Sequence, residues 1–175
     1  HAANSPATWT RPDLHFDMVR PGVSLYGLEP VGGLNHALQP AMVWSAPVVT
    51  VKPLRKGEAT GYSRAWEAPD DGFSAVIPAG YADGVMRAAS TTDGNAASPR
   101  EVIVAGKRCR ITGRISMDLM SVDVTDLPAS AVRRDMMATL IGEGLTLDEV
   151  ATQAGTISYE VLTNLGRRFH RVWKV

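Results

Sequence analysis

Residues 113–125, Gly-Arg-Ile-Ser-Met-Asp-Leu-Met-Ser-Val-Asp-Val-Thr, are the stretch around which the rest of the chain is organised. From Ile115 to Thr125 apolar and polar residues alternate, which is typical of a β-strand with one buried face. Met117-Asp118 breaks that alternation, and a rule broken inside a consistent strand more often marks a functional edge than an accident. The simpler alternative is a charged turn beside a core strand. The stretch therefore predicts a strand with a candidate site at its start.

Three tyrosines elsewhere in the chain lie among small residues rather than in alternating strands. They occur in Gly61-Tyr62, in Gly80-Tyr-Ala-Asp-Gly84, and at Tyr159, which we expect on the loop after Gly155. A tyrosine on a glycine-supported turn presents its hydroxyl to a cleft more often than one inside a strand. A half-buried surface tyrosine explains each position equally well when it is taken alone. Together the three favour phenolic hydroxyls around one pocket.

The composition indicates a soluble cytoplasmic protein and excludes several kinds of function. Its 18 basic and 18 acidic residues cancel without forming blocks, so neither nucleic acid nor a membrane surface is an expected partner. The single Cys109 rules out an internal disulfide and fits a reducing compartment. The sequence has no apolar run of membrane-spanning length and no signal peptide. The four histidines lack metal-ligand spacing, so no metal is expected.

The first 35 residues have a pattern of short helical and strand segments that is typical of the end of an α/β unit. The chain starts at His1 rather than Met and inside what reads as an active-site loop, so we expect the C-terminal part of a longer polypeptide. The pattern predicts a helical turn at Pro12–His15, a buried strand at Phe16–Val19 and a short helix at Val23–Leu28. A strand that passes through Pro-Gly into a helix start leaves backbone N–H groups unpaired, which favours a phosphate.

After a linker at residues 31–40, the sequence pattern predicts mainly β-strands. Pro47 indicates an edge strand or a bulge, and Ala105-Gly106 a tight hairpin turn. One helix is expected, with Thr146 as N-cap, Glu149 completing a capping box and Gly155 at its C-terminal end. Residues 91–99 look like a variable loop. The expected strands are Met42–Lys52, Phe73–Ala79, Glu101–Val104, Arg108–Ile111, Ile115–Val124, Met136–Ile141 and Arg168–Val175.

Taken together and in order, these motifs resemble the alanine racemase family. The motifs that carry the resemblance are His1–Ser5, Asp17–Gly27, Gly61-Tyr62, Gly80–Gly84, Gly113–Asp118 and Thr156–Glu160. The resemblance covers nearly the whole chain and implies a mainly β fold class. Residues 36–175 would form the family's C-terminal β domain with one short helix. Residues 1–35 would be the last strand and helix pieces of its N-terminal (β/α)8 barrel.

The resemblance also implies an activity, a cofactor and site residues. The activity is the pyridoxal 5′-phosphate-dependent interconversion of L-alanine and D-alanine, an isomerase reaction that either supplies D-alanine for peptidoglycan of the cell wall or degrades it. The enzyme would be a homodimer whose active site is shared across subunits, with a small amino acid as substrate. The implied roles are Tyr62 as the catalytic residue, Ser5, Gly22, Val23 and Tyr159 on the cofactor phosphate, Arg20 on the pyridine nitrogen, Met117 and Asp118 at the substrate, and Tyr81 at the pocket mouth.

Two other interpretations remain open at this stage. The first is a racemase of the same fold that acts on serine, lysine or a broad range of amino acids, and Ser63, Ser116 and Leu119 depart from residues common in the family. The second is a non-catalytic β module for dimerisation or protein contact. The family's cofactor-binding lysine belongs to a region before His1, and the chain's four lysines lie in polar settings. We therefore expect the 175-residue chain alone to be inactive.

Overall fold

The computed structural model describes residues 1–33, 38–92, 94 and 100–174. Its contacts divide the chain into two compact units, His1–Val43 and Trp44–Val175. The expected domain boundary at residues 35/36 and most of the expected loop at 91–99 lie outside the described residues. Within the described ranges, no helix is both long enough and apolar enough to cross a bilayer.

The first unit contains short helices. Helix α1 (Ser5–Thr10) is capped by Asn4, whose side-chain oxygen accepts a backbone N–H of the first turn at 3.1 Å. Pro6 fits that turn because its missing N–H would have had no helical partner. Two 3₁₀ helices, Pro12–Leu14 and Val23–Tyr26, lie where the turn and the short helix were expected.

The buried strand expected at Phe16–Val19 is wrong. The N–H of Met18 closes a turn on the carbonyl of His15 at 3.2 Å, and Phe16 has a φ of 47°. Phe16 and Met18 are 67% and 51% exposed. Four residues with an apolar pattern do not make a strand unless another segment supplies a hydrogen-bonded ladder.

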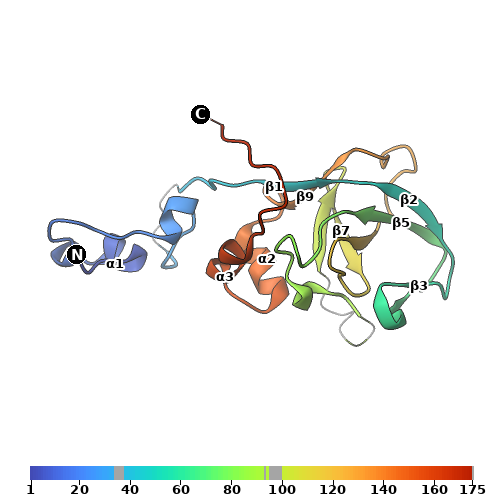
Figure 1. Ribbon diagram of the computed structural model, residues 1–175, viewed down its shortest axis with the longest axis horizontal. Helices are drawn as coiled ribbons and strands as arrows, with labels where there is room; N and C mark the ends of the chain where they lie inside the picture. Colours follow the sequence, from blue (N-terminus) through green and yellow to red (C-terminus); the bar gives the residue numbers. More distant parts are fainter. Residues whose placement is uncertain (34–37, 93, 95–99, 175) are drawn as a thin grey trace. The chain divides into compact units, whose positions relative to one another are not determined.

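The second unit is built on a seven-stranded antiparallel sheet (Figure 1) with the strand order β1-β9-β6-β7-β8-β5-β2. In β8, Met120–Asp123, buried residues alternate with half-buried ones, as expected for a strand with one face on the core. A separate two-stranded pair, β3 and β4, carries the turn at Tyr62. The strands are β1 (Trp44–Pro47), β2 (Thr50–Leu54), β3 (Ala59–Thr60), β4 (Trp66–Glu67), β5 (Gly72–Ile77), β6 (Glu101–Val104), β7 (Lys107–Thr112), β8 (Met120–Asp123) and β9 (Met137–Ile141).

The two ends of the sheet are joined through residues 48 and 49. Val48 donates its N–H to Met136, just before β9, whereas Val49 donates its N–H to Val76 of β5. One continuous segment thus hydrogen-bonds to both ends of the strand order, and the sheet curls closed around Val48, which is fully buried. Pro47 ends β1 without interrupting a central strand, as its edge position in the sheet predicts.

The hairpin between β6 and β7 is confirmed, with Ala105 and Gly106 both at positive φ. Three expected strands differ. The single strand expected at Met42–Lys52 is divided into β1 and β2, which pair with β9 and β5. The strand expected at Ile115–Val124 is shorter, because β8 begins only at Met120. The strand expected at Arg168–Val175 is wrong for its described residues: Trp173 is 86% exposed, and Phe169 attaches the segment by packing on Trp44 with ring centroids 5.6 Å apart.

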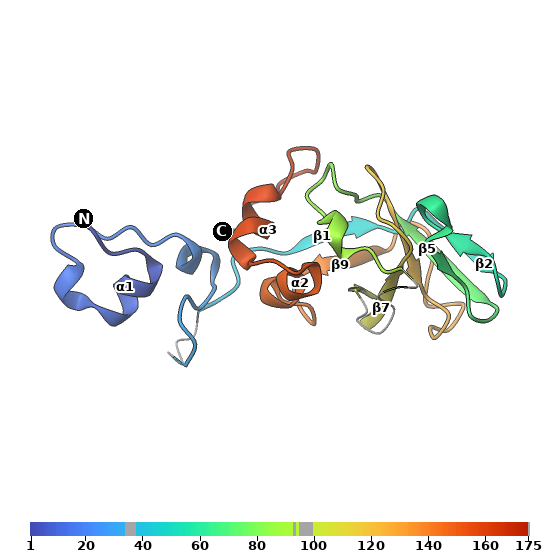
Figure 2. The ribbon, with the colours of Figure 1, turned by 90° about the horizontal axis from the view of Figure 1, so that it is seen from below.

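Two helices cover part of the sheet, where one was expected (Figure 2). Helix α2 (Leu147–Ala154) has the full capping box between Thr146 and Glu149 and ends at Gly155, which has a φ of 70°. The second helix, α3 (Ser158–Asn164), packs against α2. The four-residue spacing of Ile157, Val161 and Leu165 is the sequence signal for this helix.

Candidate functional site

Tyr62 lies at the tip of the connection between β3 and β4. Gly61 has a φ of 72°, and the two residues after the tyrosine, Ser63 and Arg64, also have positive φ values of 61° and 47°. Such angles are costly for residues with a Cβ and occur where surrounding structure imposes them, often at functional sites. The turn presents Tyr62 with 69% of its surface exposed.

The Tyr62 turn rests on the start of the stretch 113–118. A Cβ at Gly61 would overlap the backbone of Arg114, and a Cβ at Gly113 would overlap the carbonyl of Thr60. The guanidinium of Arg114 donates to the hydroxyl of Ser63 at 3.3 Å. Glycine is therefore required at both positions for the two backbones to lie this close.

The Tyr81 turn, residues 80–84, rests on the other end of the stretch 113–118. The N–H groups of Tyr81 and Ala82 donate to the carbonyls of Ser116 and Met117 at 3.1 and 3.0 Å. A side chain at Gly80 would overlap these two carbonyl groups. Tyr81 itself is 44% exposed. The stretch 113–118 thus backs both tyrosine turns, one at each end.

Met117 and Asp118 project from a tight turn rather than from a strand. The hydroxyl of Ser116 donates to the carbonyl of Leu119 at 2.8 Å, and the N–H of Ser116 donates to the same carbonyl at 3.0 Å. Just before the turn, the N–H of Ile115 donates to the Ser90 hydroxyl at 3.0 Å. The break in alternation therefore marks the point where the chain leaves its strand register.

Arg168 joins this group, although sequence analysis placed it in a strand. Its Nη1 lies 2.6 Å from Asp118 and its Nε 3.0 Å from Asp83, so that one guanidinium contacts carboxylates from two loops. The hydrogen bond to Asp118, followed by the charge of Asp83, raises the pKa of Arg168. No local sequence pattern indicated the contact, because 50 residues separate Arg168 from Asp118.

Tyr159 lies on helix α3 and not on a loop, which corrects the expectation for this residue. It occupies the first turn and is 46% exposed. The preceding Ser158 hydroxyl donates to the carboxylate of Asp148 on α2, which fixes the start of the helix. After α3, the N–H of Gly166 donates to the carbonyl of Asp83 at 2.9 Å. The helix is thereby tied through its C-terminal end to the Tyr81 turn.

The remaining candidates lie in the first unit. The Ser5 hydroxyl is buried and accepts the N–H of Gly22 at 2.7 Å and that of Ser24 at 3.4 Å. Val23, between these donors, is buried. Arg20 is exposed and is tied back by its own N–H to the carbonyl of Ala3 at 2.7 Å. Because the Ser5 oxygen accepts both N–H groups, its own hydroxyl hydrogen can donate to a phosphate oxygen.

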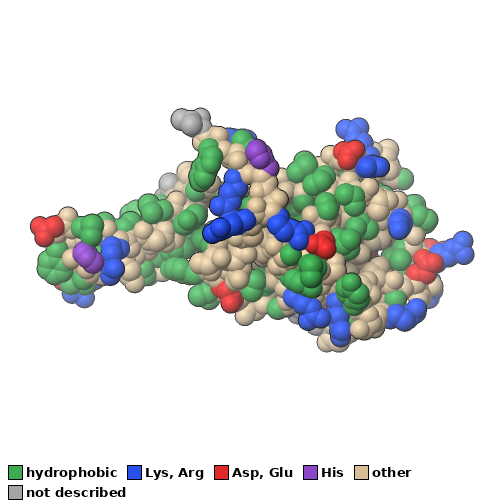
Figure 3. All heavy atoms as spheres, viewed as in Figure 1, with side chains coloured by type: hydrophobic (Ala, Val, Ile, Leu, Met, Phe, Trp, Pro, Cys, Tyr) green, Lys and Arg blue, Asp and Glu red, His purple; other side chains and the backbone are tan. Residues whose placement is uncertain are grey.

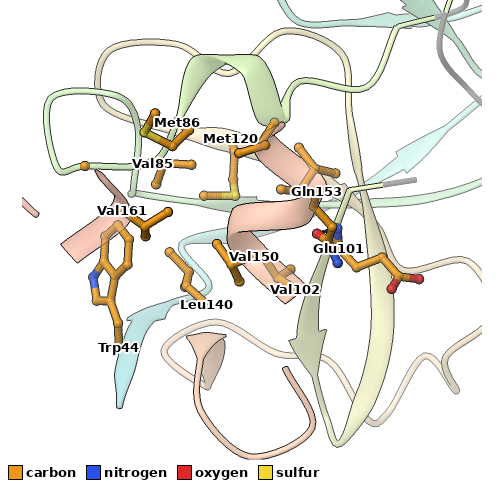
Figure 4. Close-up of a pocket in the computed structure, with 14 residues that line it drawn as sticks. Trp44, Val85, Met86, Glu101, Val102, Met120, Leu140, Val150, Gln153 and Val161 are labelled. Atoms are coloured by element: carbon orange, nitrogen blue, oxygen red, sulfur yellow. Dashed lines mark hydrogen bonds between the residues drawn. The ribbon is translucent and has the colours of Figure 1, made fainter. Parts of the chain in front are cut away.

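Two other features of the second unit are structural. Burial is the main cause that raises the pKa of the Cys109 thiol to about 11, which makes it a poor nucleophile. An apolar cavity of about 30 Å³ lies between the sheet and the two helices, and Trp44, Met120 and Val161 point into it in Figure 4. No candidate site residue lines it. In the described part of the chain, no group of three His, Cys, Asp or Glu residues could hold a metal.

Comparison with protein families places this arrangement in a known class. Residues 41–173 match the family model "Alanine racemase, C-terminal domain", and residues 1–30 match "Alanine racemase, N-terminal domain". The fold is therefore that of a racemase C-terminal β domain, preceded by a short piece of the N-terminal domain. The chain belongs to the alanine racemase family.

Individual relatives agree with this assignment. An alanine racemase of Corynebacterium efficiens is 49% identical over 93% of this chain and 42% of its own length. The crystal structure of alanine racemase from Bartonella henselae, with covalently bound pyridoxal phosphate, matches 97% of this chain and 45% of its own with a TM-score of 0.87 and 35% identity. The alanine racemase of Bacillus anthracis, with bound L-Ala-P, has a TM-score of 0.81 at 32% identity, over 94% of this chain and 42% of its own. The chain thus spans less than half the length of these relatives.

Proposed function

We propose that this chain is the C-terminal part of a pyridoxal 5′-phosphate-dependent alanine racemase, residues 36–175 being its β domain and residues 1–35 the end of its barrel. The observation that carries the proposal is the shared backing of the Tyr62 and Tyr81 turns by residues 113–118. Interconversion of enantiomers removes a proton from one face of Cα and returns one to the other. The exposed phenol of Tyr62, on a turn backed by residues 113–114, is suited to exchange the proton on one of these faces.

The residues of the first unit fit the cofactor. Ser5 and the backbone at Gly22 and Val23 would hold the phosphate, and Tyr159 of the second unit would add its hydroxyl. The guanidinium of Arg20, which stays protonated, would face the pyridine nitrogen and disfavour a proton there. When bound, the cofactor supplies the electron sink that acidifies Cα, and the protein supplies position and electrostatics.

The residues of the second unit would act on the amino acid. Tyr62 would exchange the Cα proton, Met117 and Asp118 would lie beside the substrate, and Tyr81 would narrow the mouth of the pocket. The exposure of Tyr62, Met117 and Leu119 supports their covering by a second subunit. Apolar side chains also lie among Lys and Arg on the face of the second unit drawn in Figure 3. We infer a homodimer in which Tyr62, Tyr81, Met117 and Asp118 complete the partner's site. A buried free thiol fits a cytoplasmic enzyme.

The test is made on the full-length enzyme that contains this chain. Replacing Tyr62→Phe removes the exchangeable proton, so kcat for alanine racemisation should fall about 100- to 10,000-fold. The cofactor's absorbance should be retained, because Tyr62 is not among its ligands. Tyr26→Phe is the matched control, as Tyr26 is equally a surface tyrosine, 50% exposed, but outside the candidate set. A Tyr62→Phe enzyme with the wild-type rate would refute the assignment.

A substrate panel separates the alternatives. Wild-type enzyme should racemise alanine with a higher kcat/KM than serine, lysine or other amino acids. A reversed preference would indicate a racemase of different specificity on the same fold. An isolated gene beginning near His1, with no reading frame for a barrel upstream, would favour the non-catalytic module instead.

A further inference from the structure

Arg168 bridges two loops that carry candidate site residues. Its Nε contacts Asp83, in the Tyr81 turn, at 3.0 Å, and its Nη1 contacts Asp118, in the Met117 turn, at 2.6 Å. The planar guanidinium presents its N–H donors in fixed directions, whereas the three donors of a lysine ammonium rotate and lack this planar fork.

Asp83 needs this partner because its side chain is only 9% exposed. Its other carboxylate oxygen accepts the N–H of Gly80 at 2.9 Å, a bond that closes the Tyr81 turn. A carboxylate buried without a cation would be strongly disfavoured. The contact is therefore unlike an ordinary surface ion pair, whose two members are both solvated and contribute little.

Asp118 is the exposed member, with 58% of its side chain accessible. Nothing on its own turn holds its carboxylate in one direction, since the hydrogen bonds of that turn are made by Ser116 and Leu119. The bond to Arg168 supplies that direction. The backbone of the Met117 turn, residues 116–119, is hydrogen-bonded to that of the Tyr81 turn. Arg168 adds a second link between the two turns, through the carboxylates of Asp83 and Asp118.

We propose that Arg168 is a positioning residue that holds Asp118 and the Tyr81 turn in the geometry needed for substrate binding. This inference rests on the proposed function. It also predicts which kinetic constant changes. Arg168 supports the turns that would bind substrate, whereas the Tyr62 turn is backed by Gly113 and Arg114. Substrate affinity should therefore suffer more than proton transfer.

The experiment compares Arg168→Met, Arg168→Lys and the matched control Arg167→Met in the cofactor-loaded full-length enzyme. Arg167 is the adjacent exposed arginine and makes no ion pair within the described part of the chain. Arg168→Met should raise the KM for alanine about 10- to 100-fold while kcat changes less than about threefold. Arg168→Lys should recover part of the loss, and Arg167→Met should match wild type.

A merely structural role would give a different result, because partial unfolding lowers the concentration of active enzyme. In that case apparent kcat would fall and KM would stay unchanged, and the inference would be overturned. Wild-type KM in Arg168→Met would overturn it as well.

Hydrogen exchange separates this inference from the proposed function. In Arg168→Met, the amides of Tyr81 and Ala82 should exchange at least about 10-fold faster, while those of β6 and β7 keep their rates. If wild-type enzyme lacks racemase activity, the proposed function fails, yet faster exchange confined to these amides would still support positioning by Arg168. Unchanged exchange would refute it.

Discussion

At the scale of single residues, glycines decide where the tyrosine turns can lie. Gly61 and Gly113 combine positive φ with a backbone contact that leaves no room for a Cβ. Gly57, before β3, also has positive φ, at 81°, but a Cβ there meets nothing within 4 Å. A substitution at Gly57 therefore introduces backbone strain alone, whereas one at Gly61 or Gly113 introduces both backbone strain and steric overlap.

A pair of substitutions tests that distinction. Gly57→Ala should lower the free energy of unfolding by about 1 kcal/mol, the cost of a left-handed conformation. Gly61→Ala should cost about 1–3 kcal/mol more, because its Cβ also overlaps the backbone of Arg114. Urea unfolding followed by tryptophan fluorescence measures both. Equal losses would mean that the turn at Tyr62 has room to shift away from residues 113–114.

At the scale of elements, helix α2 is specified almost entirely by its ends. Glu149 accepts the N–H of Thr146 at 2.8 Å and also bonds Arg108 of β7 at 2.6 Å, so the cap links the helix to the sheet. The hydrogen bond from the Thr146 backbone, followed by that from Arg108, lowers the pKa of Glu149. A lowered folded-state pKa contributes stability above the unfolded value, and this stability disappears as the pH falls through the folded value.

Glu149→Gln should therefore destabilise the protein at pH 7 by no more than about 1 kcal/mol, since the side chain is 41% exposed. The difference from wild type should shrink as the pH falls below the ordinary carboxyl value of 4.5. Thermal unfolding at pH 7 and at about pH 3 measures it. Glu143→Gln, at an exposed position before the helix, is the control and should change little at either pH. A loss that is the same at both pH values would contradict this account.

At the scale of the whole molecule, the proposed homodimer predicts that two different variants restore activity when they form a mixed dimer. If Arg20 serves the site of its own subunit and Tyr62 that of the partner, Arg20→Ala and Tyr62→Phe enzymes should complement each other. Equal mixing with subunit exchange makes half the dimers mixed, and each of those contains one intact site. About a quarter of wild-type activity should return.

The measurement is alanine racemisation after the two inactive enzymes are mixed and allowed to exchange subunits. Mixing either variant with itself is the control and should give no recovery. No recovery from the mixed pair, with exchange verified by differently tagged subunits, would mean that Arg20 and Tyr62 serve the same subunit's site.

The amino-acid sequence determined the features that depend on near neighbours. The caps of α2, the Ala105-Gly106 hairpin, the mainly β class and most of β5 (Gly72–Ile77, expected at Phe73–Ala79) follow from patterns a few residues long. Helix α3 has such a pattern as well, in the spacing of the apolar residues within it and at its two ends. Local hydrogen bonds and side-chain periodicity fix these features before any distant segment arrives.

Tertiary structure alone decided the features that need a partner far along the chain. The alternation at Arg168–Trp173 indicates an extended chain but supplies no neighbouring strand, so no ladder forms there. The closure of the sheet at Val48-Val49 and the bridge from Arg168 to Asp83 and Asp118 likewise join distant segments. Backbone ladders and ion pairs require two groups within about 3 Å, and for segments far apart in sequence only the folded chain sets that distance.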